Sequence, residues 1–131
     1  MKKVMYTVTA HVIRGSQYGR VLGFPTANLD GEELIDPPVS IPEGVYSGYA
    51  TIGTDSRKYR AGVVVTPLTK NKTPKIEAHL LDFTGDLYGQ TLTIYCMEFI
   101  RPFVTFTDEN LLRKQIGSDL ERIRSTLSLV E

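Results

Sequence analysis

The sequence predicts an all-β domain, an antiparallel barrel or sandwich, followed by one C-terminal helix. Between residues 4 and 100, several short stretches alternate apolar and polar residues, which is typical of half-buried strands. Turn-forming residues separate these stretches at short intervals, and no helical pattern lies between them. The spacing of apolar residues changes to three and four only after residue 107, which is where the helix is expected.

The first predicted strand runs from Val4 to Val12. Apolar side chains at every second position alternate there with Met5, two threonines and His11. A period of two places the apolar set on the core face and the polar set on the solvent face. We therefore expect His11 to point outward.

A hairpin is predicted next, with strands at Gly44–Ile52 and Arg57–Thr66 around the turn at residues 53–56. The core face of its second strand should carry Tyr59, Ala61, Val63 and Val65.

Two further strands are predicted around residues 76–80 and at Gln90–Ile100. In the shorter strand, Ile76, Ala78 and Leu80 form one face, so Glu77 and His79 share the other. Cys96 falls on the core face of the longer strand.

The helix should begin near Thr107, a suitable N-cap, with Asp108 and Glu109 in the first turn, where the helix dipole favours acidic residues. Its apolar stripe consists of Leu112, Ile116, Leu120, Ile123 and Leu127. This stripe predicts a helix that packs on the sheet.

Composition indicates one domain over residues 1–131 and excludes several classes of function. Fifteen basic and fifteen acidic residues give zero net charge, which argues against nucleic-acid binding. No apolar run approaches the roughly 18 residues of a membrane span, and residues 4–12 lack the apolar core of a signal peptide. The single cysteine suits a reducing compartment. We expect a cytoplasmic monomer.

The stretch from Arg14 to Leu29 is the main candidate for a binding site. Its glycines recur every four residues and let the backbone approach a ligand, although no P-loop pattern follows, and the same residues also form ordinary turns. Pro25 favours an extended backbone in which Thr26 and Asn28 face the same way, and their oxygens suit Mg²⁺. The candidate nucleotide-binding residues are Gly15, Gly19, Arg20, Gly23, Pro25, Thr26 and Asn28.

The run Gly23-Phe24-Pro25-Thr26-Ala27-Asn28 resembles the signature of riboflavin kinases. Further blocks follow in the family's order, and the likeness covers about Val4 to Leu127. These blocks are Pro42–Tyr46, Ile76–Phe83, Gly85–Gly89, Phe99–Pro102 and a helix that contains Gln115, Ile116 and Asp119. The resemblance implies a six-stranded antiparallel Greek-key barrel with a C-terminal α-helix packed on it, which transfers phosphate from ATP to the riboflavin 5′-hydroxyl and makes FMN.

The resemblance also implies roles for individual residues. Thr26 and Asn28 would bind Mg²⁺ and the phosphates of ATP, and Glu77 would be the catalytic base on the ribityl 5′-hydroxyl. The substrates and products would be riboflavin, FMN, ATP and ADP. Candidate flavin contacts are Arg101, Phe99, Phe103, Phe106 and the start of the last helix, although such aromatics are more often core residues.

Three departures from the family pattern leave an alternative open. Val63–Leu68 replaces a frequent Asn-x-Gly and Pro-Thr, Ala10 replaces a frequent glycine, and Phe103 replaces a frequent acidic residue that could partner Arg101. The alternative is a non-catalytic flavin- or nucleotide-binding or regulatory protein on the same barrel.

A further expectation concerns the products. Bacterial bifunctional relatives carry an adenylyltransferase module ahead of the kinase domain, and this chain begins only a few residues before its first predicted strand. We therefore expect the chain to make FMN and not FAD.

Overall fold

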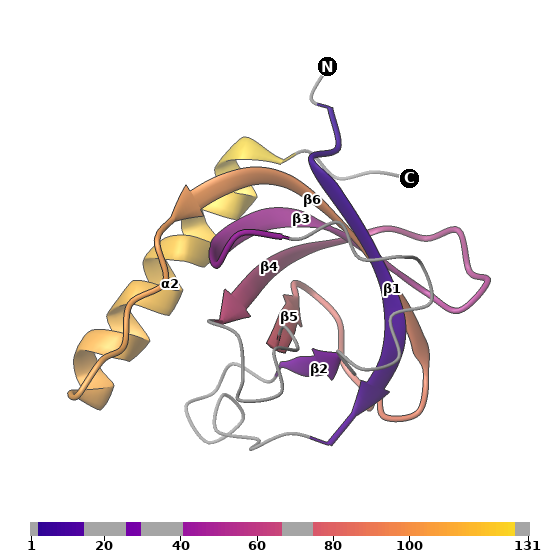
Figure 1. Cartoon of the computed structure of the whole chain (residues 1–131), viewed down its shortest axis with the longest axis horizontal. Helices are drawn as coiled ribbons and strands as arrows, with labels where there is room; N and C mark the ends of the chain where they lie inside the picture. The colour runs from indigo at the N-terminus through magenta and orange to yellow at the C-terminus, as the bar shows by residue number, and fades with distance from the viewer. Residues whose placement is uncertain (1–2, 15–25, 30–40, 67–74, 128–131) are drawn as a thin grey trace.

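The computed structural model describes residues 3–14, 26–29, 41–66 and 75–127 (Figure 1). Within these ranges the elements are β1 (Tyr6–Ile13), β2 (Ala27–Leu29), β3 (Gly44–Ile52), β4 (Tyr59–Thr66), β5 (Lys75–Leu80), β6 (Thr91–Arg101) and α2 (Glu109–Thr126). The described strands form a closed barrel in the order β1-β2-β5-β4-β3-β6, and every neighbouring pair is antiparallel. The predicted barrel is confirmed, and the sandwich alternative is wrong.

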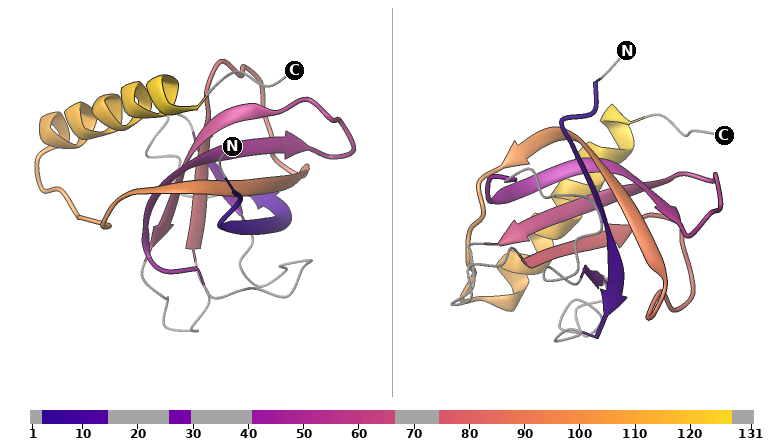
Figure 2. Two further views of the ribbon diagram at one scale, coloured as in Figure 1. Left: turned by 90° about the horizontal axis from the view of Figure 1, so that it is seen from above. Right: turned by 45° about the vertical axis from the view of Figure 1, so that its right-hand side comes forward.

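The connectivity is that of a Greek key. Strands β3, β4 and β5 are successive neighbours, and β6 returns to lie beside β3, which gives the spatial order β6-β3-β4-β5. Strands β1 and β2 then close the barrel between β6 and β5, as the views in Figure 2 show. The short β2 therefore completes the barrel wall between strands that are distant in the sequence.

Side chains of the predicted inward faces fill the barrel. Ala61, Val63 and Val65 of β4 are buried as predicted, and Tyr59 packs against them while half-buried. Val4 was expected in the first strand, but that strand begins at Tyr6 and Val4 is 48% exposed. His11 is exposed, as predicted.

Cys96 lies in the core of the barrel with its side chain fully buried. Burial raises the pKa of its thiol to about 12, because the thiolate would lose its hydration there. The thiol is therefore neutral at physiological pH and acts as a small apolar side chain.

Helix α2 packs against the outside of the barrel (Figures 1 and 2). Its N-cap is Asp108 and not the predicted Thr107. Asp108 has the extended backbone of a cap residue, and its carboxylate accepts a 2.7 Å hydrogen bond from the backbone N–H of Asn110. Because a carboxylate also carries the charge that a helix N-terminus favours, Asp108 is the stronger cap of the two.

The apolar stripe of α2 has two parts with different surroundings. Ile123 and Leu127 are buried and pack with Leu81. Gly62 of β4 permits this approach, because a Cβ atom there would lie 3.2 Å from Ile123 Cδ1. Toward the helix N-terminus, Ile116 is only half-buried and lines a cavity. The helix is therefore anchored by its C-terminal half.

Charged groups fix the C-terminal end of α2 to the barrel. The Arg60 guanidinium donates 3.4 Å hydrogen bonds to the backbone carbonyls of Arg124 and Leu127. Asp82 pairs with Arg124 at 3.1 Å and with Arg60 at 3.4 Å. The hydrogen bond from Arg124 lowers the pKa of the exposed Asp82 carboxyl, so this connection persists at neutral pH. None of the described helices has the length and apolar character that a membrane crossing requires.

Candidate active site

Pairing between β2 and β5 brings four polar side chains onto one patch of the outer surface of the barrel. Asn28 lies opposite Glu77, and Ala27 lies opposite Ala78. Opposed residues of antiparallel strands point to the same face, and both alanines point into the core. Asn28 and Glu77 therefore share the outer face. Continuing the register by one residue places Thr26 next to His79, and we call these four residues the β2–β5 quartet.

Asn28 has a feature that ordinary packing leaves unexplained. Its side chain is buried, with the residue only 6% exposed, and its Oδ1 atom has no hydrogen-bond partner among the described residues. Leaving a buried amide oxygen unpaired costs about 1–3 kcal/mol. An oxygen of this kind is a suitable ligand for a hard cation such as Mg²⁺.

The chemistry around Asn28 fits a magnesium ion shared with a substrate. The described ranges contain no group of three or more His, Cys, Asp or Glu side chains that could enclose a metal by themselves. Mg²⁺ commonly takes one or two protein oxygens and completes its shell with water and substrate phosphates. Thr26 and Asn28 supply two oxygens of that kind.

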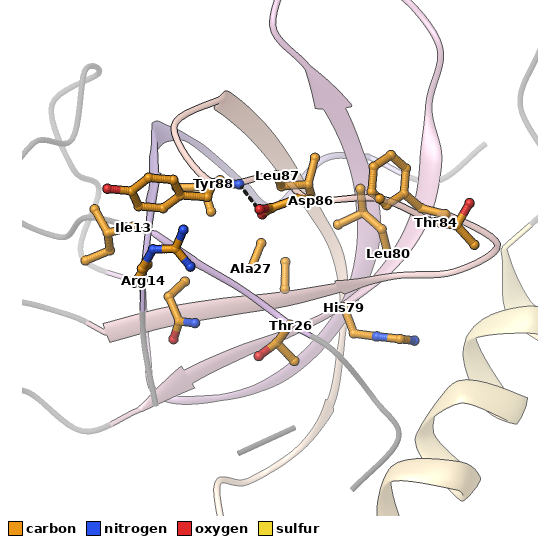
Figure 3. Close-up of a pocket in the computed structure, with 15 residues that line it drawn as sticks. Ile13, Arg14, Thr26, Ala27, His79, Leu80, Thr84, Asp86, Leu87 and Tyr88 are labelled. Atoms are coloured by element: carbon orange, nitrogen blue, oxygen red, sulfur yellow. Dashed lines mark hydrogen bonds between the residues drawn. The ribbon is translucent and has the colours of Figure 1, made fainter. Parts of the chain in front are cut away.

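A cavity of about 320 Å³, which we call the strand cavity, opens beside β1, β2, β5 and the segment that follows β5 (Figure 3). Thr26, Asn28 and His79 line it, as do Arg14 and Tyr88. The Arg14 guanidinium lies 4.2 Å from the centre of the Tyr88 ring. The ring, on a residue that is 53% exposed, offers a flat aromatic surface at this cavity.

Two residues of the strand cavity were not predicted from the sequence. Tyr88 belongs to the block at residues 85–89, which was noted without a role, and Arg14 was noted only as the start of the glycine stretch. Asp86 fixes the backbone of Tyr88 by accepting a 2.9 Å hydrogen bond from its N–H. The block of family residues at 85–89 was the available signal for this side of the cavity.

A second cavity of about 310 Å³, the helix cavity, lies between α2 and the outer face of the barrel. Glu77 lines it together with the predicted flavin contacts Arg101, Phe103 and Phe106. The helix contributes apolar side chains from Leu112, Ile116 and Leu120. The arrangement is an apolar slot with a carboxylate and a guanidinium in its wall, which suits a flat aromatic ligand with polar groups.

The aromatic candidates differ in their surroundings. Phe103 and Phe106 are half-buried and line the helix cavity, so neither is a barrel core residue. Phe99 is 42% exposed and packs edge-on against Tyr46, with ring centres 5.4 Å apart. It is not among the residues that line either cavity.

The two cavities adjoin. Thr26 and His79 line both of them, whereas Asn28 lines only the strand cavity and Glu77 only the helix cavity. The β2–β5 quartet therefore stands between two compartments of different character.

Arg101 has an acidic partner that the sequence did not identify. Its Nη2 donates to Asp119 Oδ2 at 2.8 Å, and its Nε donates to Oδ1 at 3.0 Å, which is a bidentate arrangement. Gln115 Nε2 donates to the same carboxylate at 3.0 Å. Asp119 from α2 thus partners Arg101, and the guanidinium is held at the wall of the helix cavity.

We expect Asp119→Ala to destabilise the fold by about 1–3 kcal/mol, because Arg101 would remain largely buried without its partner. The Arg101 side chain is only 19% exposed. Urea unfolding measures the loss.

The matched control is Glu98→Ala, which removes the more exposed ion pair with Arg122 at 3.3 Å. That change should cost less than about 1 kcal/mol. Equal losses in the two variants would show that the bond between Arg101 and Asp119 has no special role.

Five predicted nucleotide-binding residues, Gly15, Gly19, Arg20, Gly23 and Pro25, lie outside the described residues. Their assignments stay predictions.

The barrel places a carboxylate in one cavity and, in the adjoining one, an amide oxygen with no partner among the described residues, an arrangement that suits transfer of a group between two substrates. The profile of the flavokinase family, described as riboflavin kinase, matches residues 2–127. Riboflavin kinase from Homo sapiens is 31% identical over 134 residues, which cover all of this chain and 86% of the human protein. The chain therefore belongs to the riboflavin kinase family, whose activity uses riboflavin and ATP.

Solved structures agree with the fold. A macrolide-efflux protein from Streptococcus pneumoniae is 31% identical with a TM-score of 0.81, over 93% of this chain and 39% of that one. Riboflavin kinase from Trypanosoma brucei has a TM-score of 0.65 at 21% identity, over 97% of this chain and 81% of that one. The second likeness supports the shared barrel.

Proposed function

We propose that this chain transfers the γ-phosphoryl group of ATP to the 5′-hydroxyl of the riboflavin ribityl chain at the β2–β5 quartet, which yields FMN and ADP. The observation that carries this assignment is the cross-strand pairing of Asn28 with Glu77. It puts a cation ligand and a candidate base on adjacent strands and on one face. Phosphoryl transfer depends mainly on such positioning and on charge stabilisation.

ATP occupies the strand cavity in this proposal. Thr26 and Asn28 face its phosphates and would hold Mg²⁺, which would supply charge neutralisation for the phosphates. The Oδ1 of Asn28, which has no hydrogen-bond partner in the described part of the chain, supports this role. Tyr88 and Arg14 supply a flat ring and a cation for the rest of the nucleotide.

Riboflavin occupies the helix cavity, with its ring in the apolar slot and its ribityl chain directed to Glu77. Phe103 and Phe106 line the slot, and Arg101 is held beside them by Asp119. The support is chemical fit, because an aromatic ring system with polar edges matches an apolar wall that carries few polar groups.

Glu77 acts as the base in this scheme. Lys75 Nζ lies 3.7 Å from Glu77 Oε1 and helps to hold the carboxylate at the cavity wall. Because an alcohol is a far weaker acid than a carboxylic acid, proton transfer to Glu77 accompanies formation of the new P–O bond and does not precede it. The bond from the γ-phosphorus to the bridging oxygen breaks, and that oxygen leaves with ADP.

Turnover distinguishes this function from a non-catalytic flavin- or nucleotide-binding relative. The experiment is incubation of purified protein with riboflavin, ATP and Mg²⁺, followed by separation of products and mass spectrometry. We expect FMN and ADP to form in equal amounts from ATP, and no FMN to form when ATP is replaced by ADP. Binding of both substrates without FMN would instead support the non-catalytic alternative.

We further propose a single-domain cytoplasmic monomer that does not bind nucleic acid. The described elements form one barrel with one helix, and the buried, neutral Cys96 suits a reducing compartment. The zero net charge supports the proposal that the chain does not bind nucleic acid.

We expect Phe103→Glu to weaken riboflavin binding by up to about tenfold and to leave ATP binding unchanged. The substitution removes a ring contact worth about 0.5–1.5 kcal/mol, and the new carboxylate adds little because Arg101 already pairs with Asp119. Separate titrations with riboflavin and MgATP measure the two affinities.

Thr105→Glu is the matched control, since it adds the same charge on an exposed neighbour that lines neither cavity. If Phe103→Glu changed ATP affinity and left riboflavin affinity constant, Phe103 would belong to the ATP end of the site and our assignment would be wrong.

A further inference from the structure

The position of His79 distinguishes it from Glu77, the other quartet residue on β5. Glu77 and His79 project from the same face of the strand, but only His79 lines both cavities. Thr26, its neighbour across the strand pair, is the other quartet member that lines both. Figure 3 shows Thr26 and His79 at the same edge of the strand cavity, with the imidazole ring extending toward α2.

The boundary between the cavities is also where the transferred group must pass. In the proposed function, ATP lies in the strand cavity and the acceptor hydroxyl lies beside Glu77 in the helix cavity. The phosphoryl group therefore crosses between them at the level of Thr26 and His79. Thr26 is assigned to the cation on one strand, which leaves His79 to face the same passage from the other strand.

We propose that His79 is a further residue of the transfer site and that its imidazole donates a hydrogen bond to a γ-phosphoryl oxygen during transfer. This inference rests on the proposed function. An imidazole carries at least one N–H in either of its protonation states, so it can donate throughout. Donors fixed where charge develops stabilise a transition state without reorganisation.

The bonding changes stay those of the proposed reaction. The ribityl oxygen forms a bond to the γ-phosphorus, its proton passes to Glu77, and the bond to the bridging oxygen of ADP breaks. His79 forms no covalent bond and keeps its proton.

The test compares two nucleotides that differ by the group His79 is proposed to contact. MgADP lacks the γ-phosphoryl group, and the magnesium complex of the imido analogue of ATP, AMPPNP, carries one that is not transferred. Calorimetric titration of His79→Leu, which removes the donor, should show AMPPNP binding weakened by about tenfold or more, with ADP binding within about twofold of wild type. His11→Leu, at an exposed histidine that lines neither cavity, is the matched control and should leave both affinities unchanged.

Each other outcome has a definite meaning. Equal weakening of both nucleotides would place His79 at the base, ribose or inner phosphates, and no weakening would make it a structural residue; either result overturns the inference. Failure of the wild-type protein to bind either nucleotide would overturn the proposed function itself. The two failures are therefore distinguishable.

A second measurement does not depend on the folding of a variant. The chain has two histidines, His11 and His79, and His11 is exposed on β1 and lines neither cavity. In proton NMR of the wild-type protein, the imidazole C–H signals of His79 should differ between the MgADP and MgAMPPNP complexes. The signals of His11 should be the same in both complexes. The spectrum of His11→Gln, which lacks the His11 signals, assigns the signals to the two histidines. Identical His79 signals in the two complexes would overturn the inference.

Discussion

Replacement of Glu77 by glutamine should lower the rate of FMN formation by about 10²- to 10⁴-fold, while riboflavin affinity stays within about threefold of wild type. The amide keeps the size of the side chain and its place in the helix cavity, but it cannot accept the proton of the acceptor hydroxyl. Steady-state kinetics with riboflavin and MgATP, together with fluorescence titration of riboflavin, separate the two quantities.

The control for Glu77→Gln is Glu98→Gln. Glu98 is also a glutamate on a barrel strand, but it pairs with Arg122 and lines neither cavity. Its substitution should leave turnover within about twofold of wild type, because none of the proposed catalytic groups is changed. A loss of less than about tenfold in Glu77→Gln would exclude Glu77 as the general base.

Thr26→Ala and Asn28→Ala should each raise the KM for MgATP by about tenfold or more, because each removes an oxygen proposed to face the cation. The unfolding free energy without nucleotide should stay within about 1 kcal/mol for Asn28→Ala, since the amide oxygen that is lost has no described partner. Kinetics over a range of MgATP concentrations and urea unfolding measure both.

Thr9→Ala provides the comparison for Thr26→Ala. Thr9 is a strand threonine whose hydroxyl contacts that of Thr93 at 3.0 Å, and it lines neither cavity. Unchanged MgATP kinetics in a folded Asn28→Ala protein would remove the metal assignment.

Much of the barrel could be predicted from the sequence because a strand with one buried face has a local period of two. The predicted bounds of β3, Gly44–Ile52, are those of the structure, and those of β6 differ by one residue at each end. At Val4 the pattern continued past the strand, because alternation alone does not show where pairing stops. The N-cap was misplaced by one residue because Thr107 and Asp108 both suit that position.

The apolar stripe of α2 shows a further limit of periodicity. It predicted a helix packed on the sheet, and Ile123 and Leu127 do pack there. Leu112 and Ile116 have the same spacing, yet they line a cavity. Apolar side chains that bury against a sheet and those that receive an apolar ligand have the same sequence pattern, so only the tertiary structure separates them.

For the residues around the site, too, the sequence predicted some features and only the tertiary structure showed the others. Family likeness singled out Thr26, Asn28 and Glu77, but it did not show that Asn28 lies across the strand pair from Glu77. Family likeness also did not predict the hydrogen bonds between Arg101 and Asp119, or that His79 lines both cavities. Each depends on contacts between elements that are distant in the chain, for which no local pattern exists.

The three-residue length of β2 has a consequence for how the protein folds. Residues 27–29 pair with β5, residues 75–80, so bringing them together requires closing a long loop for few hydrogen bonds. A nucleotide held by both strands binds only the closed barrel, and by mass action it adds about 2.7 kcal/mol of stability at 100 times its dissociation constant. In the proposed function the nucleotide joins this short strand to its neighbour, so we expect saturating nucleotide to raise the free energy of unfolding.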